Sequence, residues 1–409
     1  MNDSAEFALR RAPHLADVKY EIRGPPAARA LELERAGHEI VKLNIGNPAQ
    51  FGFHMPEALR RAIADHLADA DGYTHQKGLL LAREAIAVAA RARGVQGVGA
   101  EQVFVGNGVS ELILMCLEAL CEPGDEVLVP APDYPLWTAA VTLTGARAIH
   151  YPCRPENDFV PDPEEVARLV TPRTRALVVI DPNNPTGAVY PPGIVGGLVE
   201  LAERARLVLF VDEIYDRILY DGAVHTKAAP RCHDTLCVTF NGLSKVHRAC
   251  GVRTGWVVMS GRVAEARDYL DGLEVLASLR LCANVPGQWA VPVALAADDS
   301  IVELTAESGR LGRQRRALLE GVTRSPFLRV VPPRGALYAF VGVDRAKVPG
   351  FSDARFAMDL LEREHVLVVP GSGFHVPYDD HVRLTLLPDE ATMRDVFARI
   401  DRLLATYRP

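Results

Sequence analysis

Short apolar segments alternate with helical patterns across the middle of this chain, and no other feature constrains the fold as strongly. The apolar segments end in turn residues and are typical of buried strands; they cover 103–106, 126–132, 175–182, 207–215, 237–242 and 255–261. Between the first two, apolar residues recur at helical spacing from Val109 to Leu120, until Pro123 ends the helix. Strands that alternate with helices predict a mostly parallel sheet with helices on both faces.

The pattern changes after about residue 300. A charged helix predicted over 301–322 precedes short strands within 328–343, 366–371 and 381–387, and an amphipathic helix follows. A chain of 409 residues exceeds one usual domain. We therefore expect an α/β protein with a large domain at 46–297 and a smaller α+β domain at 298–409. Residues 1–45 form an N-terminal segment that we expect to pack with the small domain.

The composition excludes several classes of protein. With 48% hydrophobic and 24% charged residues the chain can bury a core, and its net charge of -7 argues against a nucleic-acid partner. Seven cysteines without a CxxC pair favour neither a disulfide framework nor a zinc ribbon, and they indicate a reducing compartment. The first 18 residues resemble neither a signal nor a transit peptide, and no apolar run is long enough to span a membrane. We expect a cytoplasmic protein with no membrane partner.

Polar side chains gather where the predicted strands end. In parallel α/β sheets a ligand binds beyond the carboxyl ends of the strands, so these residues are candidates for a site. They are Asn107, Gly108 and Ser110 after the first strand, Asp133 and Tyr134 after the second, Asn183 and Asn184 after the third, Asp212 and Tyr215, and then Ser244 and Lys245.

Strand-end acids occur in metal sites, in nucleoside triphosphatases and in pyridoxal enzymes. Asp212 and Glu213 are adjacent on a strand and face opposite ways, and the chain has no HExxH motif, so we expect no metal. Triphosphate hydrolysis would need a GxxxxGK[ST] loop, which is absent. Taken alone, Asp212 fits a surface ion pair and Lys245 an exposed lysine. Together with an aromatic side chain and a glycine-rich turn, they favour pyridoxal chemistry, which needs an amine, an acid, a ring face and a phosphate cradle.

Three motifs then occur in a specific order: DPNNPTG at 181–187, DEIY at 212–215, and SK followed by R and GW within 244–256. With them, the chain resembles the class I aminotransferases of the type-I pyridoxal-phosphate fold over essentially its whole length. It is most similar to bacterial glutamate–pyruvate (alanine) aminotransferases. The stretches that carry this closer resemblance are 20–25, 43–53, 106–113, 129–141, 240–245 and 276–286.

The resemblance implies pyridoxal 5'-phosphate as cofactor, bound in the large domain. Lys245 resembles the lysine that forms the Schiff base with the cofactor and later carries the substrate proton. Asp212 would pair with the pyridine nitrogen, Tyr215 and Asn184 would bind the phenolic oxygen, and Tyr134 would stack on the ring.

The same resemblance implies a phosphate site and a homodimer. The phosphate would lie on the turn of Gly108, Val109 and Ser110, with Ser244 and Arg253 adding a donor and a charge. Tyr73, within GYTHQKGL at 72–79, resembles a tyrosine that reaches the phosphate of the neighbouring subunit, and Asn284 is expected near the subunit boundary. Many relatives carry a second serine three residues before the lysine, where this chain has Gly242. His247, two residues after the lysine, is expected to be a supporting or core residue.

Substrate residues are implied as well. Arg383 resembles the arginine that binds the substrate α-carboxylate as a bidentate fork, and Gly46 resembles a glycine whose backbone lies against that group. Asn184 is expected to take part. From the residues themselves, Arg23 is a candidate for the distal carboxylate of glutamate, because it lies in a turn-rich stretch that could cover the pocket and swing away when alanine binds. Tyr20 could line the same space.

The expected reaction is transamination between an L-amino acid and a 2-oxo acid, with L-alanine and 2-oxoglutarate as the favoured pair. A specialised biosynthetic aminotransferase with another amino acid is the main alternative, since relatives change substrate with few pocket changes. A pyridoxal-dependent lyase shares the fold and the lysine. A transcription regulator with an aminotransferase-like module would need a DNA-binding domain, and the residues before 43 are too few and not basic enough.

Overall fold

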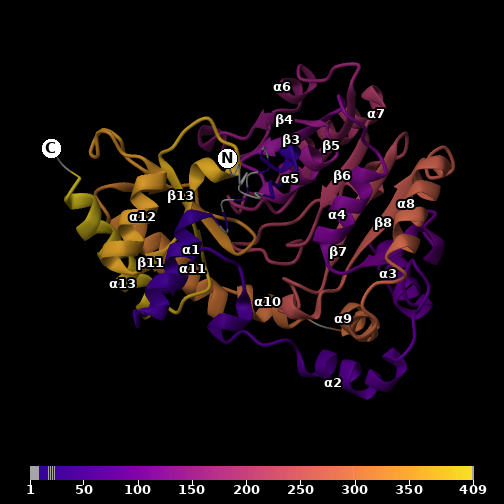
Figure 1. Ribbon diagram of the computed structural model, residues 1–409, viewed down its shortest axis with the longest axis horizontal. Coiled ribbons are helices and arrows are strands. Elements are labelled where there is room, and N and C mark those ends of the chain that lie inside the picture. The colour runs from indigo at the N-terminus through magenta and orange to yellow at the C-terminus, as the bar shows by residue number, and fades with distance from the viewer. Residues whose placement is uncertain are drawn as a thin grey trace, which may run out of the picture.

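A twisted seven-stranded sheet forms the centre of the protein, as the computed structural model shows for residues 9–16, 18, 20, 22, 24–297 and 299–407 (Figure 1). Its strands are β2 (Val103–Gly106), β3 (Glu126–Ala131), β4 (Arg147–Pro152), β5 (Thr174–Ile180), β6 (Val208–Asp212), β7 (Leu236–Gly242) and β8 (Gly255–Gly261), in the order β2-β8-β7-β6-β5-β3-β4. The five strands from β4 to β7 are parallel, and β8 is antiparallel to both of its neighbours. The predicted mostly parallel sheet is therefore confirmed.

Two features of the sheet differ from a simple strand–helix alternation. No α-helix separates β7 from β8, so β8 returns directly beside β7 and runs against it. Strand β4 was not predicted because it lies at the edge of the sheet, where only Tyr151 of its six residues is fully buried. An edge strand of this kind lacks the continuous apolar run that marks the central strands.

Helices cover both faces of this sheet. On one face lie α4 (Val109–Glu118), α5 (Pro135–Leu143) and α8 (Arg267–Leu279); on the other lie α3 (Leu80–Ala92), α6 (Pro163–Ala167), α7 (Pro192–Ala205) and α9 (Ala290–Ala297). Helix α2 (Glu57–Asp65) packs on α9 at the lower edge of the molecule in Figure 1. Because helices shield both faces, these strands are mostly apolar, and most of their polar side chains lie at or near the ends.

A smaller domain adjoins the large sheet. Its antiparallel sheet has the order β12-β13-β10-β9 and is made of β9 (Leu328–Val330), β10 (Tyr338–Val343), β12 (Val369–Pro370) and β13 (His381–Thr385). Its helices are α10 (Ser300–Thr305), α11 (Arg310–Arg324), α12 (Asp353–Glu364) and α13 (Glu390–Ala405). The single helix predicted over 301–322 is wrong: it breaks before Gly309, whose amide bonds back to the carbonyl of Ala306 and starts a new helix.

The N-terminal segment lies against this smaller domain. Helix α1 (Pro25–Arg35) contacts α12, and β1 (Val41–Lys42) pairs in parallel with β11 (Val366–Leu367). In Figure 1 the indigo α1 accordingly lies among the orange helices of the C-terminal part. The domain boundaries at residues 45 and 297 stay predictions.

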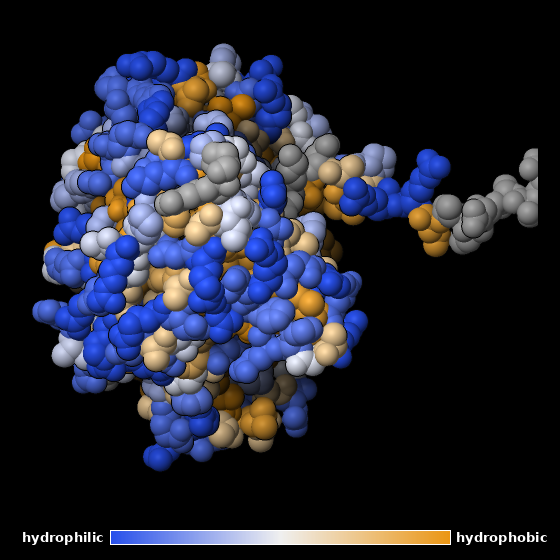
Figure 2. Space-filling view, turned by 90° about the vertical axis from the view of Figure 1, so that its left-hand side faces the viewer, coloured by the Kyte–Doolittle hydropathy of each residue, from blue (hydrophilic) through white to orange (hydrophobic). Residues whose placement is uncertain are grey.

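The surface that faces the viewer in Figure 2 is mostly hydrophilic, with hydrophobic side chains in small, separate groups. Among the helices of the described residues, none is long and apolar enough to cross a membrane.

Gly242 ends β7 directly opposite Gly255 of β8, and this pairing leaves no room for a side chain. A Cβ atom at Gly242 would lie 2.8 Å from both the Cα of Gly255 and the carbonyl oxygen of Thr254. The serine that many relatives carry at this position therefore does not fit the backbone of this chain.

We predict that Gly242→Ser lowers the free energy of unfolding by about 1–3 kcal/mol, because β7 and β8 must separate to admit the side chain. The measurement is urea unfolding followed by circular dichroism. Gly251→Ser is the matched control, since a Cβ there meets nothing within 4 Å. Equal stability of the two variants would contradict the close packing of β7 on β8.

Candidate active site

One cavity of about 460 Å³ collects most of the residues that the sequence singled out. It lies where β5, β6 and β7 end and where β10 and β13 of the smaller domain approach them. The predicted residues that line it are Tyr20, Gly46, Val109, Ser110, Tyr134, Asn184, Asp212, Tyr215, Ser244, Lys245, Arg253 and Arg383. Residues from both ends of the chain thus meet at the carboxyl ends of the parallel strands, as expected for this class of sheet.

Lys245 supplies the amine of the cavity. It follows β7 in the loop that leads to β8, and its Nζ donates a hydrogen bond of 2.8 Å to the carbonyl oxygen of Gly46. The thiol of Cys250 lies 3.8 Å from the same nitrogen. Gly46 itself is packed tightly, because a Cβ there would lie 2.2 Å from the hydroxyl of Tyr338. The amine is therefore held at the wall of the cavity by a neutral acceptor.

Asp212 supplies a buried acid at the end of β6. Asp212 is 3% exposed. Its two carboxylate oxygens accept hydrogen bonds from the Nε1 of Trp137 and the backbone amide of Ile214, each at 3.2 Å. Burial raises the pKa of Asp212 to about 6, although the hydrogen bond from Trp137 opposes the rise. A carboxylate in this state gains stability from any cationic group that enters the cavity.

An anion site adjoins the start of α4. The first N–H groups of this helix, at Val109 and Ser110, have no partner within the helix, and the positive end of the helix dipole lies there. Gly108 has a φ of +86°, and a Cβ on it would lie 2.3 Å from a guanidinium nitrogen of Arg253. A Cβ on Gly255 would lie 2.6 Å from the amide nitrogen of Val109. Glycines at both positions thus let the guanidinium and the helix start converge.

Arg383 on β13 supplies a buried cation on the opposite side of the cavity. It is 1% exposed, donates hydrogen bonds to the side-chain oxygen of Asn184 (3.1 Å) and the carbonyl oxygen of Asn44, and packs against the rings of Tyr338 and Phe374. Its Nε has no hydrogen-bond partner among the described residues. Burial lowers the pKa of the guanidinium, since none of its hydrogen-bond acceptors carries a charge. Such a group is suited to bind a carboxylate from a ligand.

Two tyrosine pairs close the cavity. Tyr134 begins α5 and its hydroxyl lies 3.2 Å from that of Tyr20, while Tyr215 donates to the hydroxyl of Tyr338 at 3.2 Å. Sequence reasoning missed Tyr338, Trp137 and the thiol of Cys250. Tyr338 starts β10 and lies beside Arg383 of β13 only because the two strands pair, which no local motif reveals.

Four further residues that the sequence singled out are not among the described residues that line this cavity. Tyr73 lies outside the cavity and is 80% exposed. Asn284 donates to the carbonyl oxygens of Val252 and Arg253 and so supports the loop that carries Arg253. His247 is buried, at 4% exposed, and does not line the cavity. Arg23 lies outside the residues that the structure describes.

The donor set of the cavity fits pyridoxal 5'-phosphate. The cofactor combines an aldehyde, a basic pyridine nitrogen and a phosphate; an amine, a buried acid and a glycine-lined helix start face the same space here. The guanidinium of Arg383, whose Nε has no hydrogen-bond partner among the described residues, remains for a second ligand that carries a carboxylate.

We predict that Asp212 makes the ligand-free protein less stable as the pH rises from about 4 to about 6. The folded protein holds the proton of Asp212 more tightly than the unfolded chain, whose carboxyl titrates near 3.8, so ionisation favours unfolding in this range. The unfolding free energy of the wild type minus that of Asp212→Asn should fall by roughly 3 kcal/mol over this range and then level off. Denaturant titrations at a series of pH values measure it.

Asp271→Asn is the control, because Asp271 forms an exposed ion pair with Arg267. If the wild type and Asp212→Asn differ by the same amount at every pH, Asp212 is not a destabilised buried carboxylate.

Comparisons with known proteins agree with this site. The family model described as aminotransferase class I and II matches residues 38–400. The glutamate-pyruvate aminotransferase AlaA of Escherichia coli (strain K12) is 45% identical over 98% of both chains, and the alanine aminotransferase of Mycobacterium tuberculosis (strain H37Rv) is 44% identical over 98% of this chain and 94% of its own. A crystal structure of an aminotransferase from Escherichia coli matches with a TM-score of 0.96 at 45% identity, over 98% of this chain and 100% of that chain. The predicted type-I fold is confirmed, and the chain belongs to the class I and II aminotransferase family.

Proposed function

We propose that this enzyme uses pyridoxal 5'-phosphate to transfer the amino group of L-alanine to 2-oxoglutarate, giving pyruvate and L-glutamate. The observation that carries the proposal is the cavity itself, in which the amine of Lys245, the buried acid of Asp212 and the buried guanidinium of Arg383 face one space. The printed names of the similar proteins from Escherichia coli and Mycobacterium tuberculosis support alanine as the amino donor.

When bound, the cofactor supplies an electron-withdrawing ring that makes the Cα proton of an attached amino acid acidic. Asp212 keeps a proton on the pyridine nitrogen, because the buried carboxylate is stabilised by that positive charge. Tyr215 and Asn184 hydrogen-bond the phenolic oxygen, and Tyr134 covers the ring. The turn of Gly108, Val109 and Ser110 holds the phosphate, with Ser244 and Arg253 as further donors.

Substrate binding and proton movement are assigned to the remaining groups. Arg383 binds the α-carboxylate of the substrate through its guanidinium fork, and the backbone at Gly46 lies beside it. The amine of Lys245, which in the ligand-free protein donates to Gly46, removes the proton from the substrate Cα and returns it to the cofactor side. Because Arg383 and Asn184 contact each other, the residue that would bind the carboxylate lies beside one that would bind the phenolic oxygen.

The position of Tyr20 supports the proposal that the N-terminal segment covers part of the cavity. Its side chain lines the cavity, and its hydroxyl lies 3.2 Å from that of Tyr134, so Tyr20 itself lies beside the proposed substrate site. Arg23 stays a sequence-based candidate for the distal carboxylate of glutamate. We also propose a cytoplasmic location, since all seven cysteines are free of disulfides.

The amino donor is tested by mixing the cofactor-loaded enzyme with each amino acid and following conversion to the aminated cofactor by absorbance. Alanine and glutamate should give the fastest conversion. Faster conversion with another amino acid would favour a specialised biosynthetic aminotransferase. Ammonia released in steady state without a 2-oxo acid would favour a lyase.

Lys245→Ala should retain the cofactor yet lose transamination by orders of magnitude, because no other amine has been assigned to move the Cα proton. The measurement is the alanine to 2-oxoglutarate rate together with cofactor content. Cys250→Ala is the matched control, since it removes the thiol beside the same nitrogen and leaves the amine. Near-normal turnover of Lys245→Ala without added amines would overturn the assignment.

A homodimer with shared sites is the second part of the proposal. Large hydrophobic side chains are exposed on two neighbouring segments: Leu67, Tyr73, Leu80, Leu81 and Val88 on the first, and Val275, Leu279 and Leu281 on the second. The segments touch, because Lys77 pairs with Glu274 and Arg280 donates to the carbonyl of Gln76. Exposed apolar side chains gathered on two touching segments favour burial against another chain.

Tyr73 lies within this surface, and we propose that it reaches the phosphate site of the partner subunit. Hybrid dimers test this: Lys245→Ala and Tyr73→Ala chains, each weakly active alone, should regain activity when unfolded together and refolded as a mixture, because one site of the hybrid then has both residues intact. Activity that never exceeds that of the separate variants, or a fully active monomer, would contradict shared sites.

A further inference from the structure

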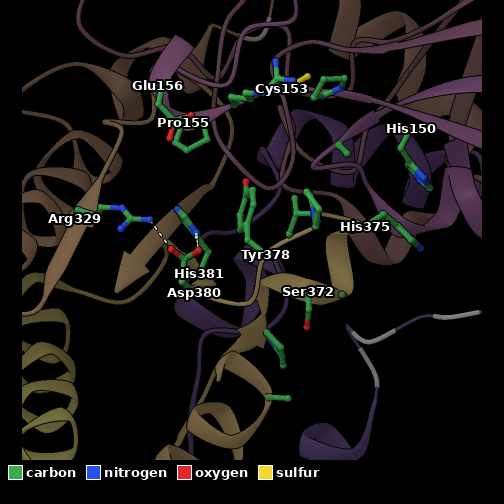
Figure 3. A pocket seen from close by; sticks show the side chains of 18 residues that line it. His150, Cys153, Pro155, Glu156, Arg329, Ser372, His375, Tyr378, Asp380 and His381 are labelled. Atoms are coloured by element: carbon green, nitrogen blue, oxygen red, sulfur yellow. Dashed lines mark hydrogen bonds and ion pairs between the residues drawn. The ribbon is translucent and has the colours of Figure 1, made fainter. Parts of the chain in front are cut away.

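A second, larger hollow of about 1080 Å³ lies apart from Lys245, between the ends of β3 and β4 and the segment that leads into β13 (Figure 3). One part of its wall carries the imidazoles of His150 and His375, which lie side by side with ring centroids 4.8 Å apart and planes 10° apart. The ion pair of Arg329 with Asp380 lies elsewhere in the same hollow.

Asp133 lies behind the two histidines and contacts His375 directly. It is completely buried, and its Oδ1 lies 2.8 Å from the Nδ1 of His375. The hydroxyl of Thr138 donates to the other carboxylate oxygen at 2.5 Å and lies 2.9 Å from the Nε2 of His150. One ligand atom from each of Asp133, His150 and His375 lies within 4.8 Å of the other two, and no other such trio occurs in the described part of the chain.

These three side chains are a ligand set for zinc. Two imidazole nitrogens and one carboxylate oxygen bind Zn²⁺ at about 2.0–2.2 Å, which places ligand atoms of a tetrahedral site roughly 3.4 Å apart. Side-chain movements of about 1 Å would bring the three ligand atoms from within 4.8 Å of one another to this spacing. The hollow is lined by both histidines and gives space for water beside them, and the hydroxyl of Thr138 donates to the carboxylate of Asp133, as groups behind metal ligands commonly do.

We propose that Asp133, His150 and His375 form a binding site for Zn²⁺ or a similar divalent transition metal, with the fourth position open to the hollow. The metal replaces the hydrogen bond between the Nδ1 of His375 and the Oδ1 of Asp133. Because these two residues are 242 positions apart in the sequence, the bound metal ties the start of α5 to the turn before β13. Metal binding here does not depend on which amino acid the enzyme uses.

The site also lies close to the catalytic cavity. Asp133 immediately precedes Tyr134, which lines that cavity, and His375 immediately follows Phe374, whose ring packs against Arg383. The backbone amide of Asp133 in addition donates to the carbonyl oxygen of Phe374 at 3.2 Å. A metal at this position therefore joins the two segments that support the ring face and the carboxylate site.

Equilibrium dialysis tests the proposal with the full-length, cofactor-loaded enzyme after treatment with a chelator. With Zn²⁺ alone as the probe, the wild type should bind about one equivalent per chain. His150→Gln and His375→Gln should each weaken binding at least about 10-fold. Zn²⁺ should raise the melting temperature of the wild type and leave that of both variants unchanged.

His38→Gln is the matched control, because His38 is exposed and its ring contacts the ring of His365 outside this cluster. It should bind Zn²⁺ like the wild type. Melting temperatures without metal show whether each variant is folded, and His375→Gln carries the test if His150→Gln does not fold. Equal Zn²⁺ binding by the wild type and the folded variants, or no binding by the wild type, would overturn the proposal; the cluster would then be a hydrogen-bond network alone.

Discussion

A buried carboxylate and a buried guanidinium, held apart in one cavity, are the constraint on which the rest of this site depends. Asp212 accepts hydrogen bonds from two neutral N–H groups, and Arg383 donates to two carbonyl-type oxygens and packs against two aromatic rings. Neither arrangement fully offsets the cost of removing a charge from water. The folded protein therefore retains binding energy for a ligand that is cationic near Asp212 and anionic near Arg383.

The topology of the sheet explains how these charges are kept apart and aligned. Asp212 and Lys245 lie at the ends of neighbouring parallel strands, whereas Arg383 comes from the antiparallel sheet of the smaller domain. In the site that we propose, the cofactor would thus bind to the large domain and the substrate carboxylate to Arg383 of the small one. The contact between Arg383 and Asn184 joins the two parts at the substrate position.

The sequence predicted the parts of this arrangement that local patterns encode. Buried parallel strands are continuous apolar runs, so β3, β5, β6 and β7 were predicted close to their observed bounds, and the polar residues at their ends were recognisable as a site. Motif resemblance added Arg383 and Gly46, which no periodicity connects to Lys245. The exposed edge strand β4 and the break before Gly309 lack such a pattern, and both were missed.

Contacts between distant segments escaped sequence reasoning for a different reason. Trp137 reads as an ordinary core residue of α5 until its indole N–H is seen to meet Asp212. His150 and His375 carry no ligand spacing in the sequence, because only the fold brings them to Asp133. Gly242 shows the reverse case: the sequence shows that a serine common in relatives is missing, and the structure gives the reason, because the backbone of β8 leaves no space for a side chain there.

The most direct test of the central claim is to reduce the cofactor-loaded enzyme with borohydride and to find the labelled residue by peptide mass spectrometry. Borohydride fixes pyridoxal phosphate permanently to the amine that holds it. The site described here predicts a single pyridoxyl label on the peptide that contains Lys245, and loss of that label when alanine is added first. A label on another lysine, or none, would contradict the assignment of Lys245 and of the cavity around it as the catalytic centre.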